Sequence, residues 1–119
     1  MNDDTFENLE IWKEAIELAA RVYELFEGCR DFGFRDQIQR SSVSISSNIA
    51  EGYERDSNTE FIRYLFIEKG SCGEVRSQTV LARRVKLLNE ADATVLMSDA
   101  KRLSMRIMRL IHVRREKFS

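Results

Sequence analysis

Residues 8–27 read NLEIWKEAIELAARVYELFE, and this stretch carries the clearest structural signal in the chain. Its apolar side chains recur at alternating steps of three and four, at Leu9, Trp12, Ile16, Ala19, Tyr23 and Phe26. That spacing forms one apolar stripe on an α-helix, so we predict a helix over about residues 8–27 with the stripe turned toward its neighbours. We expect Gly28 to end this helix in a left-handed conformation.

The same spacing recurs in three segments further along the chain. We predict helices over about residues 34–54, 58–88 and 90–115. The second helix places isoleucines and small polar residues on its stripe, namely Ile38, Ser42, Ile45, Ile49 and Tyr53. The third is expected to begin at a capping signature, in which Ser57 and Glu60 each satisfy a free backbone N–H. The fourth has the stripe Leu96, Ala100, Leu103, Ile107, Leu110 and Ile111, with Met97, Met105 and Met108 beside it.

The composition supports one helical domain. The chain has 119 residues, of which 43% are hydrophobic and 33% charged, and it contains no proline and only five glycines. This length is enough for one core, and the residues that punctuate turn-rich β-folds are nearly missing. Short connections make successive helices antiparallel neighbours. We therefore predict an all-α fold, an up-down-up-down antiparallel four-helix bundle that forms a single domain over residues 1–119.

The sequence indicates a cytoplasmic protein. No apolar run approaches the roughly 18 residues that span a bilayer, and the first ten residues, MNDDTFENLE, are acidic where a signal peptide would be basic. We therefore expect no membrane association. The two cysteines, Cys29 and Cys72, are too far apart in sequence for a CxxC pair, so we expect free and mostly buried thiols.

Charge is divided sharply along the chain. Residues 1–75 carry 8 Lys and Arg against 16 Asp and Glu, whereas residues 76–119 carry 11 against 4. The candidate nucleic-acid-binding cations lie at the end of the third helix and on the fourth: Arg83, Arg84, Lys86, Lys101, Arg102, Arg106 and Arg109. Three of these, Arg102, Arg106 and Arg109, are spaced to form one ridge. Such ridges bind phosphates of RNA or DNA through charge and counterion release.

Two interpretations of this charge division remain open. In the first, the protein is a nucleic-acid-associated accessory factor that uses the basic surface. In the second, the acidic helices of one subunit face the basic helix of the next, and the protein is a homo-oligomeric scaffold or protein-interaction module that binds no nucleic acid. The methionine-rich second face of the last helix favours a contact with another subunit or a protein partner.

A polar face on the second helix aligns with polar positions on the third. We name as the polar seam the residues Gln37, Ser41, Ser44, Asn48, Glu51, Glu68, Ser71, Glu74 and Gln78. Buried polar groups without partners cost about 1–3 kcal/mol each, so we expect Glu68, Ser71 and Gln78 to find partners among the serines and Asn48. We interpret the polar seam as structural or intersubunit, with a ligand site as the alternative.

Signatures of catalysis are missing. His112 is the only histidine, and the residue three positions before it is Arg109 rather than an acid, so the Glu-x-x-His spacing of di-metal bundles is not present. The run Gly70-Ser71-Cys72-Gly73 differs from the GxSxG nucleophile elbow and lies within a predicted helix. Glycine-rich phosphate loops are also missing. We predict no enzymatic activity, no bound metal and no cofactor.

Several motifs together resemble a known family. They are Phe6, Leu9 and Trp12, then Gln37, Arg40, Ser41 and Ser44, then Asn48-Ile49-Ala50-Glu51-Gly52, then Glu60-Phe61-Ile62-Arg63-Tyr64-Leu65, and finally Gly70-Ser71 with Glu74. Over essentially its entire length the chain resembles the bacterial four-helix-bundle proteins whose genes often lie in intervening sequences of 23S ribosomal RNA genes. It departs from their pattern at Glu68, where members usually carry a small residue such as alanine.

The resemblance implies a left-handed bundle that assembles into a ring-shaped homo-oligomer, which is a pentamer in the related proteins. The accessory proteins of diversity-generating retroelements are similar in fold, and they bind nucleic acid and a reverse transcriptase. No enzymatic activity is established for the intervening-sequence proteins. The resemblance therefore implies a fold and an assembly, and it associates the chain with ribosomal RNA or retroelement-like functions.

Overall fold

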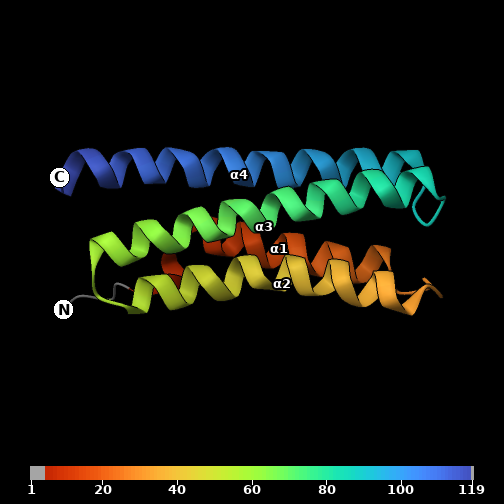
Figure 1. The fold of residues 1–119 in the computed structure, drawn as a ribbon, viewed down its shortest axis with the longest axis horizontal. Coiled ribbons are helices and arrows are strands. Elements are labelled where there is room, and N and C mark those ends of the chain that lie inside the picture. The colour runs from red at the N-terminus through yellow and green to blue at the C-terminus, as the bar shows by residue number, and fades with distance from the viewer. Residues whose placement is uncertain (1–4, 119) are drawn as a thin grey trace.

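The computed structural model describes residues 5–118, which form four α-helices after a short 3-10 turn, Phe6–Asn8 (Figure 1). The helices are α1 (Glu10–Leu25), α2 (Phe32–Glu54), α3 (Asn58–Arg84) and α4 (Glu90–Phe118). They lie side by side in an elongated body 47 Å long and 24 by 20 Å across. Residues 5–118 contain no strand, so the all-α prediction is confirmed.

Ion pairs between the first and last helices show how the chain is arranged. Arg21 of α1 pairs with Asp99 of α4, whereas Glu14, which comes earlier on α1, pairs with Arg106, which comes later on α4. The residue numbers run in opposite directions, so these two helices are antiparallel. Short loops also join α1 to α2, α2 to α3 and α3 to α4, and they reverse the chain each time (Figure 1). The packing is that of the predicted antiparallel four-helix bundle.

Side-chain caps set the starts of three helices. The Asp31 carboxylate accepts a hydrogen bond from the backbone N–H of Phe34 at 3.1 Å, so α2 begins at Phe32, two residues earlier than predicted. Ser57 accepts from the N–H of Glu60 at 3.3 Å, which confirms its half of the predicted capping signature, whereas the Glu60 carboxylate accepts hydrogen bonds from Arg63. The Asn89 side chain accepts from the N–H of Asp92 at 2.7 Å and places the start of α4 at Glu90.

The end of α3 differs from the sequence prediction, because the helix ends at Arg84 rather than near residue 88. Lys86 adopts a left-handed backbone with φ of 66°, and its N–H donates to the carbonyl of Arg83 at 3.2 Å. The N–H of Leu87 donates to the carbonyl of Ala82 at 2.8 Å. This pair of hydrogen bonds is a Schellman motif, which usually contains glycine at the left-handed position. A lysine there gave no sequence signal for a helix end.

The end of α1 also corrects a prediction. Gly28 was expected to stop the helix in a left-handed conformation, but no glycine among the described residues has a positive φ. The helix ends at Leu25, and the N–H of the following Phe26 still bonds back to the carbonyl of Val22 at 3.1 Å. Phe26 is fully buried, so its burial in the core accompanies the end of the helix.

The apolar stripe predicted on α1 is wrong in part. Ile16 and Tyr23 are exposed, and Trp12 is only half-buried. The residues of α1 that reach the core are Ile11, Ala15, Leu18, Ala19 and Val22. Four of them, Ile11, Ala15, Leu18 and Val22, also recur at steps of three and four, but this stripe is rotated by about one position, or about 100°, around the helix. Apolar side chains cover a wide arc of α1, and packing against α2 and α4 selects one side of it.

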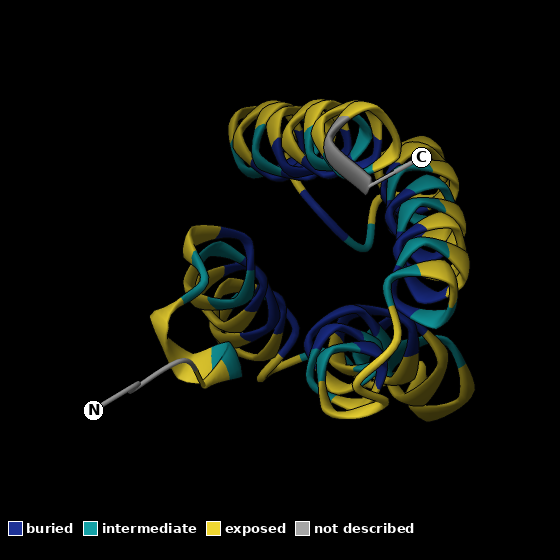
Figure 2. Ribbon diagram, turned by 90° about the vertical axis from the view of Figure 1, so that its left-hand side faces the viewer, coloured by how far each residue is buried: buried dark blue, intermediate teal, exposed yellow. Residues whose placement is uncertain are grey.

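The stripes predicted on α2 and α4 are confirmed. Ile38, Ile45 and Ile49 of α2 and most of the α4 stripe, including Leu103 and Ile107, are buried at the centre of the bundle. Figure 2 shows the buried side of every helix turned toward the common axis, with exposed residues outside. None of the helices in the described residues is both long and apolar enough to cross a bilayer.

Candidate nucleic-acid interface

Three of the predicted cations lie at the end of α3. Arg83 and Arg84 occupy its last turn, where positive charge suits the helix dipole, and Lys86 lies in the loop to α4. All three side chains are exposed and form no ion pair within residues 5–118. Arg83 and Lys86 line a hollow together with Asn89 and Glu90 at the start of α4.

Arg83 belongs to a longer row of cations that sequence reasoning missed. Lys69, Arg76 and Arg83 recur every seven residues on α3, which is close to two helical turns, so they lie on one side of the helix. That side faces α4, because Arg83 lines a groove with Ala93 and other residues of α4. The seven-residue spacing is the sequence signal for this row, in which only Arg83 was predicted; Lys69 lies in the part of the chain with net negative charge.

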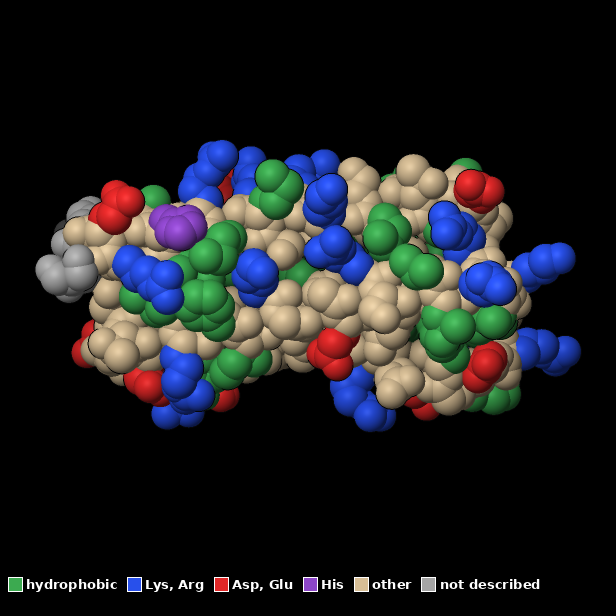
Figure 3. Space-filling view, turned by 45° about the horizontal axis from the view of Figure 1, so that its top comes forward, with side chains coloured by type: hydrophobic (Ala, Val, Ile, Leu, Met, Phe, Trp, Pro, Cys, Tyr) green, Lys and Arg blue, Asp and Glu red, His purple; other side chains and the backbone are tan. Residues whose placement is uncertain are grey.

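Lys101 of α4 extends this row across the helix pair. It lies about two helical turns after Ala93, on the same side of α4 as Met97 and Met108. Both methionines are half-buried. We call Lys69, Arg76, Arg83 and Lys101 the basic track. Figure 3 shows Lys and Arg side chains spread along the length of this face of the molecule.

Among residues 5–118, the basic track has no acidic partners. None of its four side chains forms an ion pair among the described residues. Arg76 is half-buried, and its buried Nε has no hydrogen-bond acceptor in residues 5–118. A cation that is partly withdrawn from water and lacks a counter-ion attracts an external anion more strongly than a fully solvated one.

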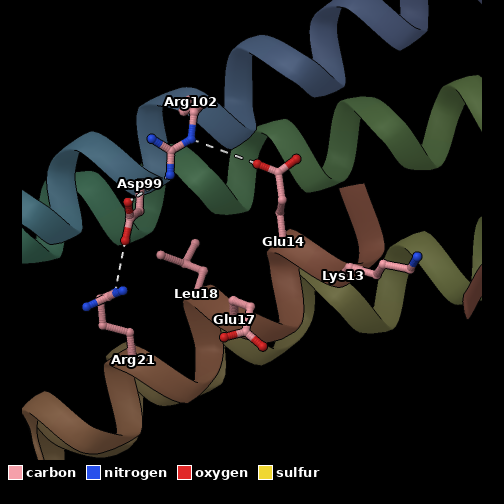
Figure 4. A pocket seen from close by; sticks show the side chains of 7 residues that line it. All are labelled: Lys13, Glu14, Glu17, Leu18, Arg21, Asp99 and Arg102. Atoms are coloured by element: carbon pink, nitrogen blue, oxygen red, sulfur yellow. Dashed lines mark hydrogen bonds and ion pairs between the residues drawn. The ribbon is translucent and has the colours of Figure 1, made fainter. Parts of the chain in front are cut away.

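Arg102 and Arg106, by contrast, turn to the other flank of α4 and face α1. Arg106 donates to a Glu14 oxygen at 2.7 Å, and Arg102 pairs with Asp99 at 3.0 Å and lies 3.9 Å from the second Glu14 oxygen. Figure 4 shows Glu14 and Arg102 pointing toward each other across the groove between α1 and α4. The three arginines of the predicted ridge therefore differ. Arg102 and Arg106 form ion pairs, whereas Arg109 is exposed and forms none in the described region.

The far end of α4 uses its cations to hold α3. The guanidinium of Arg114 lies 4.7 Å from the ring centroid of Phe61, and its Nη1 donates to the side chain of Asn58 at 3.3 Å. The guanidinium of Arg115 lies 5.1 Å from the ring of the exposed Phe66. These contacts are structural in character, and they continue the positive surface beyond Lys69.

The polar seam is joined at two points only. The hydroxyl of Ser44 donates to that of Ser71 at 2.9 Å and links α2 to α3. The hydroxyl of Tyr64, which was not predicted, donates to Glu51 at 3.1 Å. The remaining bonds of the polar seam stay within α2, since Ser41 donates to the carbonyl of Gln37 and Asn48 to that of Ser44. The side chains of Gln37 and Glu74 are exposed.

Glu68 contradicts the expectation that α2 would supply its hydrogen bonds. The residue is 0% exposed, and neither carboxyl oxygen has a partner among the described residues. Two of the expected partners bond elsewhere, because Asn48 donates to the carbonyl of Ser44 and the hydroxyl of Ser44 donates to that of Ser71. Burial raises the pKa of Glu68 to about 9, so the side chain is neutral at pH 7. The same buried surroundings raise the pKa of Cys72, one turn further along, to about 12.

Other chemistry has little support in the structure. Residues 5–118 contain no group of three His, Cys, Asp or Glu side chains placed to hold a metal ion. Cys29 and Cys72 are free, and only Cys72 is buried. Gln78 is half-buried, and its buried side-chain oxygen also lacks a partner in this range. The arrangement can therefore attract anions along the basic track.

Comparison with known proteins agrees with the four-helix fold. A family model described as 23S rRNA-intervening sequence protein matches residues 7–109. The fold is similar to a crystal structure from Bacteroides thetaiotaomicron, described as a protein of unknown function from the S23 ribosomal protein family. The TM-score is 0.79 and the sequence identity 23%, and the match covers 85% of this chain and 97% of that chain. At that identity the similarity shows the fold alone. Among curated proteins, none matches significantly.

Proposed function

The chain belongs to the 23S rRNA-intervening sequence protein family, and from that premise we propose that it is a non-enzymatic, homo-oligomeric accessory protein that binds RNA through the basic track. The observation that carries the proposal is the set of four cations on α3 and α4 with no acidic partner in the described chain. Neither the family description nor that of the similar structure names a catalytic activity.

The geometry favours contact with phosphates rather than with bases. Arg83 is near the start of α4 and Lys101 lies about 12 Å further along that helix, so the cations follow a line rather than surround a pocket. A line of cations matches the regular charges of a nucleic-acid backbone and gives binding with little dependence on sequence. RNA is the expected ligand because the family is named after the intervening sequences of 23S rRNA.

Charge reversal on the basic track tests the proposal. The variant Arg83→Glu with Lys101→Glu is compared with a matched control, Arg30→Glu with Arg63→Glu, which makes the same change in net charge on other surfaces. Binding of a fluorescein-labelled single-stranded RNA is measured by anisotropy from about 0.05 to about 0.3 M salt. The wild type should bind with micromolar or tighter affinity that falls steeply with salt.

The first variant should lose about tenfold or more in affinity and have a shallower salt dependence, since each lost phosphate contact lowers the slope by about 0.7 for a single strand. The control variant should remain close to the wild type. Equal losses in both variants would show that only net charge matters, and absence of RNA binding by the wild type at the lowest salt would refute the proposal.

A second candidate function, a protein scaffold without nucleic-acid binding, is favoured by the outer face of α3. Its exposed apolar side chains are Phe66, Ile67, Val80, Leu81 and Val85. Between them, Gly70 and Gly73 lie where an added Cβ would meet no atom within 4 Å. A glycine inside a helix costs about 1 kcal/mol relative to alanine, and packing within this chain gives no reason for either one. The face is shaped for close approach of another helix.

The opposite side of the molecule carries a different apolar surface, formed by the exposed Ile16 and Tyr23 of α1 and Val43 of α2. Two unlike surfaces on different sides permit head-to-tail contacts between copies, which close into a ring when the rotation allows. We therefore include homo-oligomerisation in the proposed function. Light scattering measures the mass of the oligomer. An oligomer that shows no RNA binding near 0.15 M salt would favour the second candidate.

A further inference from the structure

The groove between α1 and α4 contains a series of alternating charges, and Figure 4 shows its members Arg21, Asp99, Arg102 and Glu14. Arg21 pairs with Asp99 at 2.9 Å, Asp99 with Arg102 at 3.0 Å, and Arg102 lies 3.9 Å from Glu14, which holds Arg106 at 2.7 Å. Two carboxylates therefore engage the two cations that α4 turns away from the basic track. Because α1 supplies Glu14, the first helix neutralises part of the positive surface of the last.

The members of these pairs differ in their access to solvent. The side chains of Glu14 and Asp99 are 26% and 21% exposed, whereas those of Arg102 and Arg106 are 60% and 51% exposed. The carboxylates lie lower in the groove, and the guanidinium groups form its outer rim. An anion that approaches α4 from outside therefore meets the guanidinium groups first and competes with Glu14 for their N–H donors.

We propose that Glu14 is an autoinhibitory phosphate mimic, which occupies Arg102 and Arg106 and restricts RNA to the other flank of α4. The inference rests on the proposed RNA-binding function and adds a regulation of that site. The diameter of a helix is about 10–12 Å, so a nucleic-acid strand bound on the basic track lies within reach of the second pair of cations. Exposed ion pairs are weak enough for a phosphate to replace the carboxylate.

The groove supplies its own matched control. Glu17 lines the same groove one turn from Glu14 but forms no ion pair in the described part of the chain. Glu14→Gln and Glu17→Gln change the net charge equally, but only the first removes the carboxylate that faces Arg106 and Arg102. Arg106 then loses its ion pair, whereas Arg102 keeps the one with Asp99. A purely structural role for Glu14 would alter thermal stability without a specific gain in RNA affinity.

The test measures binding of the labelled single-stranded RNA to the wild type, Glu14→Gln and Glu17→Gln over a range of salt. Glu14→Gln should bind about two- to fivefold more tightly than Glu17→Gln, the range that one exposed ion pair represents. Its salt slope should be steeper by about 0.7 for each phosphate gained. Adding Arg106→Gln should abolish the gain in the Glu14→Gln background and have a smaller effect in the wild type, as a double-mutant cycle detects.

Equal affinity and slope for Glu14→Gln and Glu17→Gln would overturn autoinhibition, and the RNA-binding function would stand if Arg83→Glu with Lys101→Glu still weakened binding. Failure of all three proteins to bind RNA at the lowest salt would overturn both. Glu14→Ala serves as a second variant, and circular dichroism of each protein verifies that the bundle is folded. A gain in Glu14→Gln that survives Arg106→Gln with no coupling would also contradict the inference.

Discussion

Gly52 of α2 lies directly against the side chain of Tyr64 of α3, so closely that a Cβ at position 52 would stand 2.9 Å from Cγ of the ring. The hydroxyl of Tyr64 then donates to Glu51 at 3.1 Å and accepts from Arg55 at 2.8 Å, so both ends of the tyrosine are held by the last turns of α2. This contact sets how closely the two helices approach at this end of the bundle.

Replacement of Gly52 by alanine should therefore destabilise the protein. The added methyl would overlap Tyr64, and overpacking of this kind costs about 1–3 kcal/mol. Gly33→Ala is the control, because Gly33 lies in the exposed first turn of α2 and its nearest atom would be 3.9 Å away. The free energy of unfolding of Gly33→Ala should rise by about 0.5–1 kcal/mol. Urea unfolding measures both, and equal stabilities would contradict the importance of the contact.

The buried Glu68 should make stability fall as pH rises. Its pKa is raised from 4.5 to about 9 in the folded protein, so between these values the folded state holds a proton that the unfolded state has lost. The free energy of unfolding should decrease by up to about 1.4 kcal/mol per pH unit in this window, and the effect should level off above about pH 9.

The variant Glu68→Gln tests this linkage, because the amide is neutral in both states. Near pH 4.5 the free energy of unfolding of this variant should equal that of the wild type, and at pH 8 it should be higher. Between these values it should change less with pH than that of the wild type. Urea unfolding at several pH values gives the two curves. Parallel curves would show that Glu68 does not titrate differently on folding.

Lys86 should be a site where glycine stabilises the fold. Its φ of 66° places it in the left-handed region, which costs a non-glycine residue about 1–2 kcal/mol. Lys86→Gly should raise stability by about 1 kcal/mol relative to Lys86→Ala, which loses the same charge but keeps a Cβ. Thermal unfolding of the two variants compares them, and an equal midpoint would argue against strain at this residue.

The outer face of α3 should control assembly. Phe66→Lys with Leu81→Lys places two charges on the exposed apolar surface and should lower the mass of the oligomer measured by light scattering. Val95→Lys is the control, because Val95 is a comparably exposed valine on α4. An unchanged mass in the double variant, or the same decrease in the control, would place the interface elsewhere.

Local sequence determined the helices, because their signals depend on near neighbours in the chain. The hydroxyl of Ser57 caps α3 through an N–H three residues away, and Ile45 and Ile49 share one face through the helical period alone. The all-α fold followed from these repeats and from the lack of proline. The predicted end of α3 was wrong at Lys86 because residue type was the signal used. Its left-handed conformation accompanies backbone hydrogen bonds, and lysine does not indicate that conformation.

Tertiary structure decided which of two equivalent patterns was used. On α1, both the predicted stripe and the series Ile11, Ala15, Leu18 and Val22 have steps of three and four, and only the positions of α2 and α4 select the second. Likewise, Arg102 and Arg109 look alike in sequence, yet only Arg102 meets acids of the α1–α4 groove. Spacing along a helix determines which residues share a face, whereas burial and charge pairing depend on which neighbouring helix that face meets.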